Sequence, residues 1–274
     1  MIYQVIQPSL HLQDFIKDYL LLHYVFDKNE PTPIKPFPAN TQHCLVFYLR
    51  GGVTAIDPKT GLSKVYPKTS INGSQISRFD FHLSPHYLMF SVNFQPSALS
   101  KFLKLPLTEF IDERIDAEAI LNPEIHYLHD QLANVNSYES IVEMVEHYLW
   151  KRIQKLKSDC HPIEKVAKII LENPNSFNVE KMASLACLSI SQFERKFVQQ
   201  IGITPKFYAR INRFYQAYQI KDKNPKADWL SIALETGYHD YQHLVKDFKQ
   251  FSDTSPHSLL EAQANSPERI LGIA

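Results

Sequence analysis

The chain repeats one pattern, first as VEKMASLACLSISQFERKFVQQIGITP (residues 179–205) and again as WLSIALETGYHDYQHLVKDFKQFSDTSP (residues 229–256). Matching positions lie fifty residues apart in the first part of each stretch and fifty-one apart in the rest, so one residue has been added inside a turn. The matching pairs are Val179 with Trp229, Met182 with Ile232, Ala183 with Ala233, Phe193 with Leu244, Phe197 with Phe248 and Pro205 with Pro256. The duplication predicts two units of one fold.

Helix-start and helix-end signals divide each copy into short helices. Asn178 is placed to cap a first helix, and Ser189 with Gln192 has the form of a capping box for a second. In the later copy Gly237 can end a helix in the left-handed conformation, and Asp240 can cap the next one. The cap-then-proline pairs that start a third helix in each copy are Thr204-Pro205 and Ser255-Pro256. Each copy is therefore predicted to be a helix-turn-helix.

The second helix of each copy leaves a polar face exposed. At about 100° per residue, Phe193 and Phe197 set the inward direction of the first one. The outward side chains are Ser191, Gln192, Glu194, Arg195 and Gln199 in the first copy, and Gln242, His243, Val245, Lys246, Lys249 and Gln250 in the second. Arg or Lys can bind guanine and Gln can bind adenine in the major groove of DNA. A lone helix of this kind is most often just solvated, but two in a duplicated scaffold favour DNA recognition.

A long helix is expected between the copies. Phe207, Phe214 and Tyr218 recur at helical spacing between residues 205 and 222. A helix of that length spans roughly 27 Å at 1.5 Å per residue. Because successive major grooves on one face of DNA lie about 34 Å apart, such a rod can present both second helices to one duplex.

The second copy closely resembles the signature of the AraC/XylS-type transcriptional regulators. The resemblance rests on residues 232–240, IALETGYHD, and on Leu244, Lys246, Phe248 and Ser255-Pro256. The first copy, residues 188–205, resembles the upstream unit of that family. The resemblance covers about residues 161–261. It implies an all-α domain of two helix-turn-helix units joined by a long helix, whose two recognition helices bind adjacent major-groove segments.

Carried over by position, the family's base-facing sites can be located in this chain. They fall on Ser191, Glu194, Arg195, Tyr241, Gln242, His243, Val245 and Lys246, and helix geometry adds Gln192, Gln199 and Lys249. Glu194 departs from the pattern in character, because phosphates repel a carboxylate unless it accepts from a cytosine amino group. Tyr241 stands where smaller or amide side chains are frequent. The resemblance implies double-stranded DNA, a second copy of the chain and RNA polymerase as partners of a transcription activator or repressor.

Length and composition indicate a globular protein of two domains. The chain has 274 residues, with 29 basic and 29 acidic side chains. No apolar run approaches the roughly twenty residues that span a bilayer, and the residues after Met1 lack the features of a signal peptide. Three widely spaced cysteines, Cys44, Cys160 and Cys187, suit a reducing compartment. We expect a cytoplasmic homodimer with no membrane partner, cofactor or metal, and its zero net charge predicts modest DNA affinity per monomer.

The first hundred residues predict a β-rich domain. Residues 10–24 begin at helical spacing and then become extended, and residues 31–38 are expected to form a proline-rich loop. Runs rich in β-branched and aromatic residues follow at 43–49, 52–56, 63–66, 70–72, 77–83 and 87–94. This spacing predicts a sandwich or barrel. In the AraC-type regulators a cupin-like β-barrel that senses a small molecule commonly holds this place, and the strand order resembles it.

These expectations define an α+β protein with four segments. They are a cupin-like β-barrel sensor domain with flanking helices at 1–118, a helical linker at 119–158, an AraC-type DNA-binding domain at 159–262 and a tail at 263–274. The linker helices either pair two subunits or pack on the barrel, and the sequence leaves both open. The polar run at 155–161 marks the domain boundary.

A small-molecule effector is expected inside the barrel. The candidate effector-binding residues are Phe47, Arg50, Arg78 and Phe81. The two arginines could pair with an acidic effector, although exposure on the surface is the commoner fate of such side chains. Aromatic side chains on strands are likewise more often core than pocket.

Two other classes of protein are alternatives. A cupin-type metal-dependent enzyme with a helical appendix would use His43, His82 and His86, but Pro85 disfavours a strand that puts the last two on one face. No catalytic triad spacing, phosphate loop or paired zinc-ligand motif is present. A protein–protein adaptor would retain no DNA sequence selectively. Because neither explains a duplicated polar helix, the sequence favours a regulator without enzyme activity.

Overall fold

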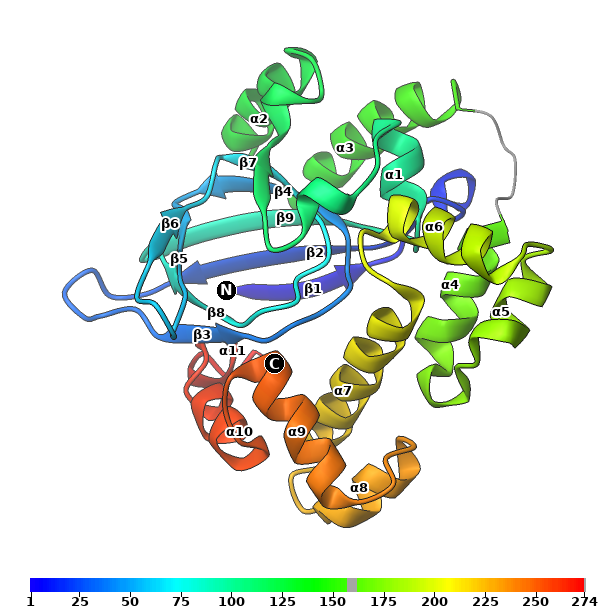
Figure 1. Cartoon of the computed structure of the whole chain (residues 1–274). Helices are drawn as coiled ribbons and strands as arrows, with labels where there is room; N and C mark the ends of the chain where they lie inside the picture. The colour runs from blue at the N-terminus through cyan, green and yellow to red at the C-terminus, as the bar shows by residue number, and fades with distance from the viewer. Residues whose placement is uncertain (157–161, 274) are drawn as a thin grey trace.

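The computed structural model describes residues 1–156 and 162–273, with two β-sheets in the amino-terminal half and helices in the carboxyl-terminal half (Figure 1). The larger sheet has six strands in the order β1 (Ile2–Ile6), β2 (Ile16–Val25), β9 (His86–Phe94), β4 (Cys44–Arg50), β7 (Thr69–Asn72) and β10 (Arg114–Asp116). The smaller sheet has four strands in the order β3 (Ile34–Phe37), β8 (Phe79–Leu83), β5 (Val53–Ile56) and β6 (Ser63–Val65).

Alternate residues of the six-stranded sheet face two separate cores. On β4, Leu45 and Phe47 join an apolar cluster with the helices, whereas Val46 and Tyr48 join a cluster that includes Val53 from the smaller sheet. The two sheets therefore form a sandwich. The expected cupin-like barrel is not confirmed, because strand pairing in the described residues leaves β1, β10, β3 and β6 at sheet edges and closes no ring.

Two segments of the sandwich differ from their sequence patterns. Residues 16–20, expected to belong to a helix that begins near Leu10, already form the first half of β2, and only Leu10–Leu12 makes a short 3-10 helix, η1. The extended segment expected from Leu21 is confirmed. Side chains are buried on both faces of β2, including those of the neighbours Leu21 and Leu22. Apolar residues therefore do not alternate with polar ones along this strand, and their spacing resembles that of an amphipathic helix. The expected loop at 31–38 contains β3, an edge strand, where a proline is tolerated.

Helices cover the outer face of the six-stranded sheet (Figure 1). They are α1 (Ala98–Leu103), α2 (Glu124–Asn134) and α3 (Tyr138–Ile153), with the 3-10 turns η2 (Thr108–Phe110) and η3 (Ala117–Ala119) between them. The predicted break at residues 134–137 is confirmed, and the predicted apolar side chains are buried: Leu128, Leu132, Ile141, Val145, Tyr148, Leu149 and Ile153. Of the expected boundary at 155–161, residues 157–161 lie outside the described part. No helix in that part is long and apolar enough to cross a membrane.

The carboxyl-terminal domain contains the two predicted helix-turn-helix units. Its elements are α4 (Pro162–Glu172), η4 (Pro174–Ser176), α5 (Val179–Leu185), α6 (Ile190–Ile201), α7 (Pro205–Lys223), α8 (Trp229–Glu235), α9 (Tyr241–Ser252), α10 (Pro256–Ala264) and α11 (Pro267–Ile270). The first unit is α5 with α6 and the second is α8 with α9, and α7 runs between them (Figure 1). One apolar cluster joins both units to α7, with Phe197, Phe214 and Phe248 all 0% exposed.

The end of the chain returns to the sandwich. Lys35 Nζ lies 2.6 Å from Glu268 Oε1, and Gln263 Nε2 donates to the Pro36 carbonyl at 2.9 Å. Leu271 and Ile273 pack against the core between the two sheets. The segment expected to be a tail is thus attached to β3 and to the sandwich core.

The sandwich domain contacts the carboxyl ends of both second helices. The Leu107 amide donates to the Gln199 carbonyl of α6 at 2.9 Å, and the Ala39 amide donates to the Phe251 carbonyl of α9 at 2.9 Å. Gly202, with φ +95°, ends α6 against Leu107, where a Cβ would come within 2.8 Å of the Leu107 carbonyl oxygen. One domain therefore fixes the ends of two helices that belong to different units.

His43 is buried in this interface and should make folding sensitive to acid. Its Nε2 lies 3.1 Å from Ser74 Oγ and 3.1 Å from the Ile201 carbonyl, and since a carbonyl only accepts, Nε2 carries a proton in the neutral ring. Burial lowers the pKa of His43 from 6.5 to about 4, although the bond to Ile201 opposes the shift. Between these values the unfolded chain binds the extra proton and the folded chain does not, so stability falls as pH falls.

We expect this single group to cost about 3 kcal/mol of unfolding free energy between pH 6.5 and pH 4, at 1.36 kcal/mol per pKa unit. Urea unfolding at several pH values measures it, with His43→Gln as the comparison, because other groups titrate equally in both proteins. The variant should lose most of the slope in that window. Parallel curves for the two proteins would contradict the assignment.

Candidate DNA-binding surface

The first unit is built by the caps that its sequence predicts. Asn178 accepts from the Lys181 amide at 2.7 Å and starts α5. Ser189 and Gln192 form the capping box of α6, with both reciprocal bonds at 3.3 Å. Phe193, Phe197 and Ile201 are buried on the inner face of α6. The opposite face of α6 therefore lies toward solvent.

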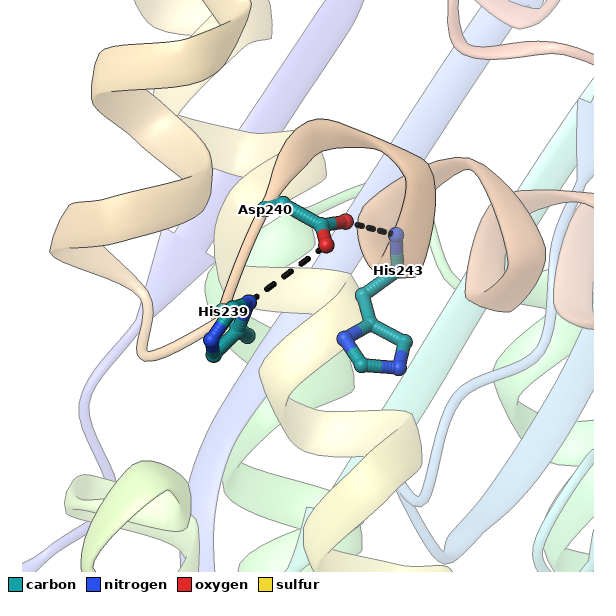
Figure 2. Close-up of side chains that lie close together, drawn as sticks. All are labelled: His239, Asp240 and His243. Atoms are coloured by element: carbon teal, nitrogen blue, oxygen red, sulfur yellow. Dashed lines mark hydrogen bonds and ion pairs between the residues drawn. The ribbon is translucent and has the colours of Figure 1, made fainter.

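The second unit repeats this construction with other residues. Gly237 has φ +78° and ends the turn after α8, as predicted from its left-handed preference. Asp240 Oδ1 then accepts from the His243 amide at 2.8 Å and caps α9 (Figure 2). This bond is also the main reason why the pKa of Asp240 lies below its ordinary value. The inner face of α9 is Leu244, Phe248 and Phe251, each 0% exposed.

The predicted DNA-contacting residues lie on the outer faces of these two helices. Ser191, Gln192, Glu194, Arg195 and Gln199 are exposed on α6, and Tyr241, Gln242, His243, Lys246 and Lys249 are exposed on α9. Val245 is half-buried. Tyr241, whose side chain is 38% exposed, stands at the first position of α9. The rod between the two helices, α7, has 19 residues and spans about 28 Å.

A buried ionic cluster that the sequence reading missed holds α9 to α7. Asp247 Oδ1 lies 2.6 Å from Arg210 Nη2, and its Oδ2 lies 3.1 Å from Arg213 Nη2 and 3.1 Å from the Tyr238 hydroxyl. The Asp247 side chain is 6% exposed. Burial, then Asp247, raises the pKa of Tyr238, which keeps the hydroxyl protonated as a donor. The available signal was an aspartate between Leu244 and Phe248, on the inward side of α9.

Three potential metal ligands meet at the start of α9 (Figure 2). His239, Asp240 and His243 each offer one ligand atom, and these atoms all lie within 4.8 Å of one another. Among the described residues, these three form the cluster of histidine and acidic side chains that is compact enough to hold a metal ion. Imidazole and carboxylate are ligands that transition metals accept. The helix cap already explains the position of Asp240, and His239 and His243 are exposed.

The histidines of the enzyme alternative do not converge. His43 lies in the domain interface against Ser74 and Ile201. His86, on β9, pairs instead with His23, their Nε2 atoms being 3.0 Å apart. His82 lies on β8 of the smaller sheet. The structure therefore forms no metal centre from the three histidines that an enzyme would need.

The four candidate effector residues are also separated. Phe47 packs under the helices, whereas Phe81 packs between the sheets, with its ring 4.6 Å from that of Phe37. Arg78 forms an ion pair with Asp80 at 2.8 Å. Arg50 ends β4 and is half-buried. These four side chains line no common cavity, because the sheet separates Phe47 from Phe81.

Comparisons with known proteins agree with this geometry. A family described as "Helix-turn-helix domain" matches residues 182–262, and one described as "Domain of unknown function (DUF6597)" matches residues 4–116. An uncharacterized HTH-type transcriptional regulator of Haemophilus influenzae is 36% identical over 89 residues, 32% of this chain and 29% of that protein. The HTH-type transcriptional regulator MtrA of Neisseria gonorrhoeae is 29% identical over 91 residues, 33% of this chain and 30% of that protein. The chain thus matches less than a third of the length of these relatives.

The fold of the whole chain also has a relative of known structure. The crystal structure of ToxT from Vibrio cholerae superposes with a TM-score of 0.50 at 12% identity, over 89% of this chain and 98% of that one. At this identity the likeness concerns the fold alone. The two helix-turn-helix units joined by α7 lie in the part of the chain that matches the helix-turn-helix family. Residues 182–262 thus match a helix-turn-helix domain family, and the relatives similar to this part of the chain are HTH-type transcriptional regulators.

Proposed function

We propose that the protein is a sequence-specific DNA-binding transcriptional regulator controlled by a small molecule that binds its amino-terminal domain. The observation that carries the proposal is the pair of like-built units whose polar helix faces are exposed while their phenylalanines are buried. Side chains that read bases must be free of other partners, and no ion pair of Arg195, Lys246 or Lys249 is found in the described residues. The protein would act in the cytoplasm.

The exposed side chains differ in what they can read. Arg195 can donate two bonds to guanine, and Gln242 can bind adenine. Glu194 can accept from a cytosine amino group, whereas Lys249 is placed for a phosphate. Val245 offers an apolar contact to a thymine methyl group. This assignment gives each helix its own base preferences, so a full site contains two segments.

Arg195→Ala and Lys246→Ala are expected to lose roughly 1–3 kcal/mol of discrimination, each at one base pair. Competition binding with operator variants measures this, once a bound sequence is in hand. Lys28→Ala is the matched control, since Lys28 is exposed in a turn of the other domain. Unchanged base preference in both variants, with DNA still bound, would contradict the assignment of the two helices.

Effector control would act through the contacts at the two helix ends. The sandwich domain holds the end of α6 through Leu107 and the end of α9 through Ala39. A ligand that binds one arrangement of these contacts better than another changes DNA affinity by the same free-energy difference. The spacing of the two helices is thus the quantity that the effector would alter.

A second copy of the chain is proposed to bind at α2 and α3. These helices frame a groove of about 410 Å³, lined by Tyr127, Leu128, Met144 and Tyr148 among others. Tyr127 is 67% exposed there. Pairing would double the number of DNA contacts, which a chain with zero net charge needs for tight binding. Contact with RNA polymerase is part of the same proposal.

A further inference from the structure

His239, Asp240 and His243 bring three metal-binding side chains together where the turn of the second unit meets α9 (Figure 2). His239 Nδ1 lies 3.4 Å from Asp240 Oδ2. Two ligands bound tetrahedrally at about 2.0–2.2 Å from a zinc ion are roughly 3.3–3.5 Å apart, so this pair already has a suitable separation. The rings of His239 and His243 are nearly perpendicular, with centroids 6.2 Å apart. Small rotations of these side chains would bring all three ligand atoms onto one ion.

The backbone that carries the three ligands is held in place on both sides. Tyr238, directly before His239, is 3% exposed, and its hydroxyl donates to Asp247 Oδ2 at 3.1 Å. Leu244, directly after His243, is 0% exposed. Because the fold fixes the positions of the ligands along the chain, a metal ion has to order only their side chains. Less conformational entropy is then lost on binding.

The two carboxylate oxygens of Asp240 have different contacts. Oδ1 accepts from the His243 amide at 2.8 Å and caps α9, whereas Oδ2 makes the longer contact to His239. The capping bond is the main cause that lowers the pKa of Asp240, so the carboxylate is ionised at neutral pH. A metal ion can bind Oδ2 while Oδ1 continues to cap the helix. The cap therefore accounts for one oxygen and leaves the other for a ligand.

The types of ligand select the class of metal. Two imidazoles and a carboxylate suit zinc, nickel and copper, whereas Mg²⁺ and Ca²⁺ bind oxygen ligands. His239 and His243 have three residues between them, a spacing found in paired zinc-binding histidines. Three protein ligands leave a coordination position open on a tetrahedral ion. Both histidines are exposed, so an ion reaches them directly from solvent.

We propose that His239, Asp240 and His243, the α9 metal site, bind one divalent transition-metal ion such as Zn²⁺, and that the bound ion strengthens DNA binding. This proposal departs from the sequence-based expectation that the protein binds no metal. The metal site rests on the geometry of the three side chains. Its effect on DNA rests on the proposed function.

The effect on DNA follows from the place of the site and from its charge. His243 is one of the predicted DNA-contacting residues, and helix starts such as that of α9 commonly contact phosphates. The ionised carboxylate of Asp240 repels phosphates when no metal is bound. A divalent ion bound to one carboxylate and two neutral imidazoles makes the site positive, and its open position can bind a phosphate oxygen. One ring nitrogen of His243 would bind the ion while the other remains a hydrogen-bond donor.

Calorimetric titration of the full-length protein, prepared without a histidine tag, with Zn²⁺ tests the site. We expect one ion per chain, with Mg²⁺ unable to displace it. His239→Gln and His243→Gln should each weaken Zn²⁺ binding by about tenfold or more. His257→Gln is the matched control, because His257 is an exposed histidine on α10 of the same domain, and its loss should leave the affinity unchanged. Failure of Zn²⁺ to saturate the protein below millimolar concentration, or equal binding by all four proteins, would overturn the proposal.

Asp240→Asn separates the role of Asp240 as a ligand from its role as a helix cap. Asparagine caps helices about as well as aspartate does, so the thermal stability of the metal-free protein should change little. The loss of the negative charge should nevertheless weaken Zn²⁺ binding by about tenfold or more. A variant that binds Zn²⁺ as tightly as the wild type would show that the carboxylate is no ligand and would contradict the site.

DNA binding distinguishes the metal site from the proposed function. With a bound sequence in hand, saturating Zn²⁺ should raise the DNA affinity of the wild type at least about fivefold, within the usual range of coupling between two sites. His239→Gln should bind DNA as the metal-free wild type does and should not respond to Zn²⁺, since His239 is not among the predicted DNA-contacting residues. Zn²⁺ bound at the site with DNA affinity unchanged or lowered would overturn the effect on DNA. Failure of both the metal-free and the Zn²⁺-bound protein to retain any DNA would contradict the proposed function and leave the metal site standing.

Discussion

Phe197→Ala should destabilise the carboxyl-terminal domain by about 3–5 kcal/mol, the usual cost of emptying a buried aromatic position. Phe197 is 0% exposed, and its ring lies 5.6 Å from that of Phe193 and 5.4 Å from that of Tyr208. It therefore joins α6 to α7, and its loss removes packing between the first unit and the rod. A domain of ordinary stability, about 5–15 kcal/mol, would lose much of its margin and its DNA binding.

Urea unfolding followed by circular dichroism measures this loss. Ile190→Ala is the matched control, because Ile190 lies on the same helix with 42% of its side chain exposed. That variant should change stability by about 0.5 kcal/mol or less. Equal effects of the two substitutions would show that α6 does not bury the face assigned to it.

Asp247→Ala is expected to cost about 2–3 kcal/mol, because it removes the carboxylate that binds two partly exposed arginines. The two ion pairs and the Tyr238 hydrogen bond all end on this one side chain. Arg213 also stacks on the Tyr238 ring at 4.1 Å, so its position depends on the same cluster. The second unit should then separate from α7 more readily than the first.

Hydrogen exchange can locate this effect while thermal unfolding measures its size. Amides of α8 and α9 should lose protection more than those of α5 and α6. Glu235→Ala, at an exposed carboxylate of the same unit, serves as the control and should be nearly neutral. A loss below about 1 kcal/mol for Asp247→Ala, or a loss of protection spread evenly over the domain, would contradict the role given to the cluster.

The carboxyl-terminal units could be predicted because their signals are local. A capping box at Ser189 and Gln192, an aspartate cap at Asp240 and a left-handed glycine at Gly237 each act within a few residues. The apolar stripes of α6 and α9 follow from the same short segments. The Asp247 cluster was not predicted, because it joins helices that are far apart in the sequence. Arg210 and Asp247, for example, are 37 residues apart.

The amino-terminal domain was harder to predict because its strands are buried on both faces. β2 mixes two apolar faces and thereby imitates a helix, and β3 accepts a proline because it is an edge strand. Aromatic and basic residues could be assigned to strands but not to a face, since a one-residue shift reverses the side of the sheet. Phe47 and Phe81 were grouped for that reason, although they belong to different apolar clusters.

Two of the contacts between the domains carry no sequence signal. They are the backbone hydrogen bonds from Leu107 to Gln199 and from Ala39 to Phe251. Backbone amides and carbonyls are the same at every position, so no residue type marks them. These contacts are nevertheless the ones that would connect an effector to the spacing of the two helices.

Selection of bound sequences from a random DNA pool by the full-length protein tests the central claim most directly. The account predicts enriched sequences with two short specific segments about one helical turn, or 10 base pairs, apart, because α6 and α9 would occupy successive major grooves. Repetition of the whole site would indicate a dimer. Failure to enrich any sequence, or enrichment of one segment alone, would contradict the claim that both helices read DNA.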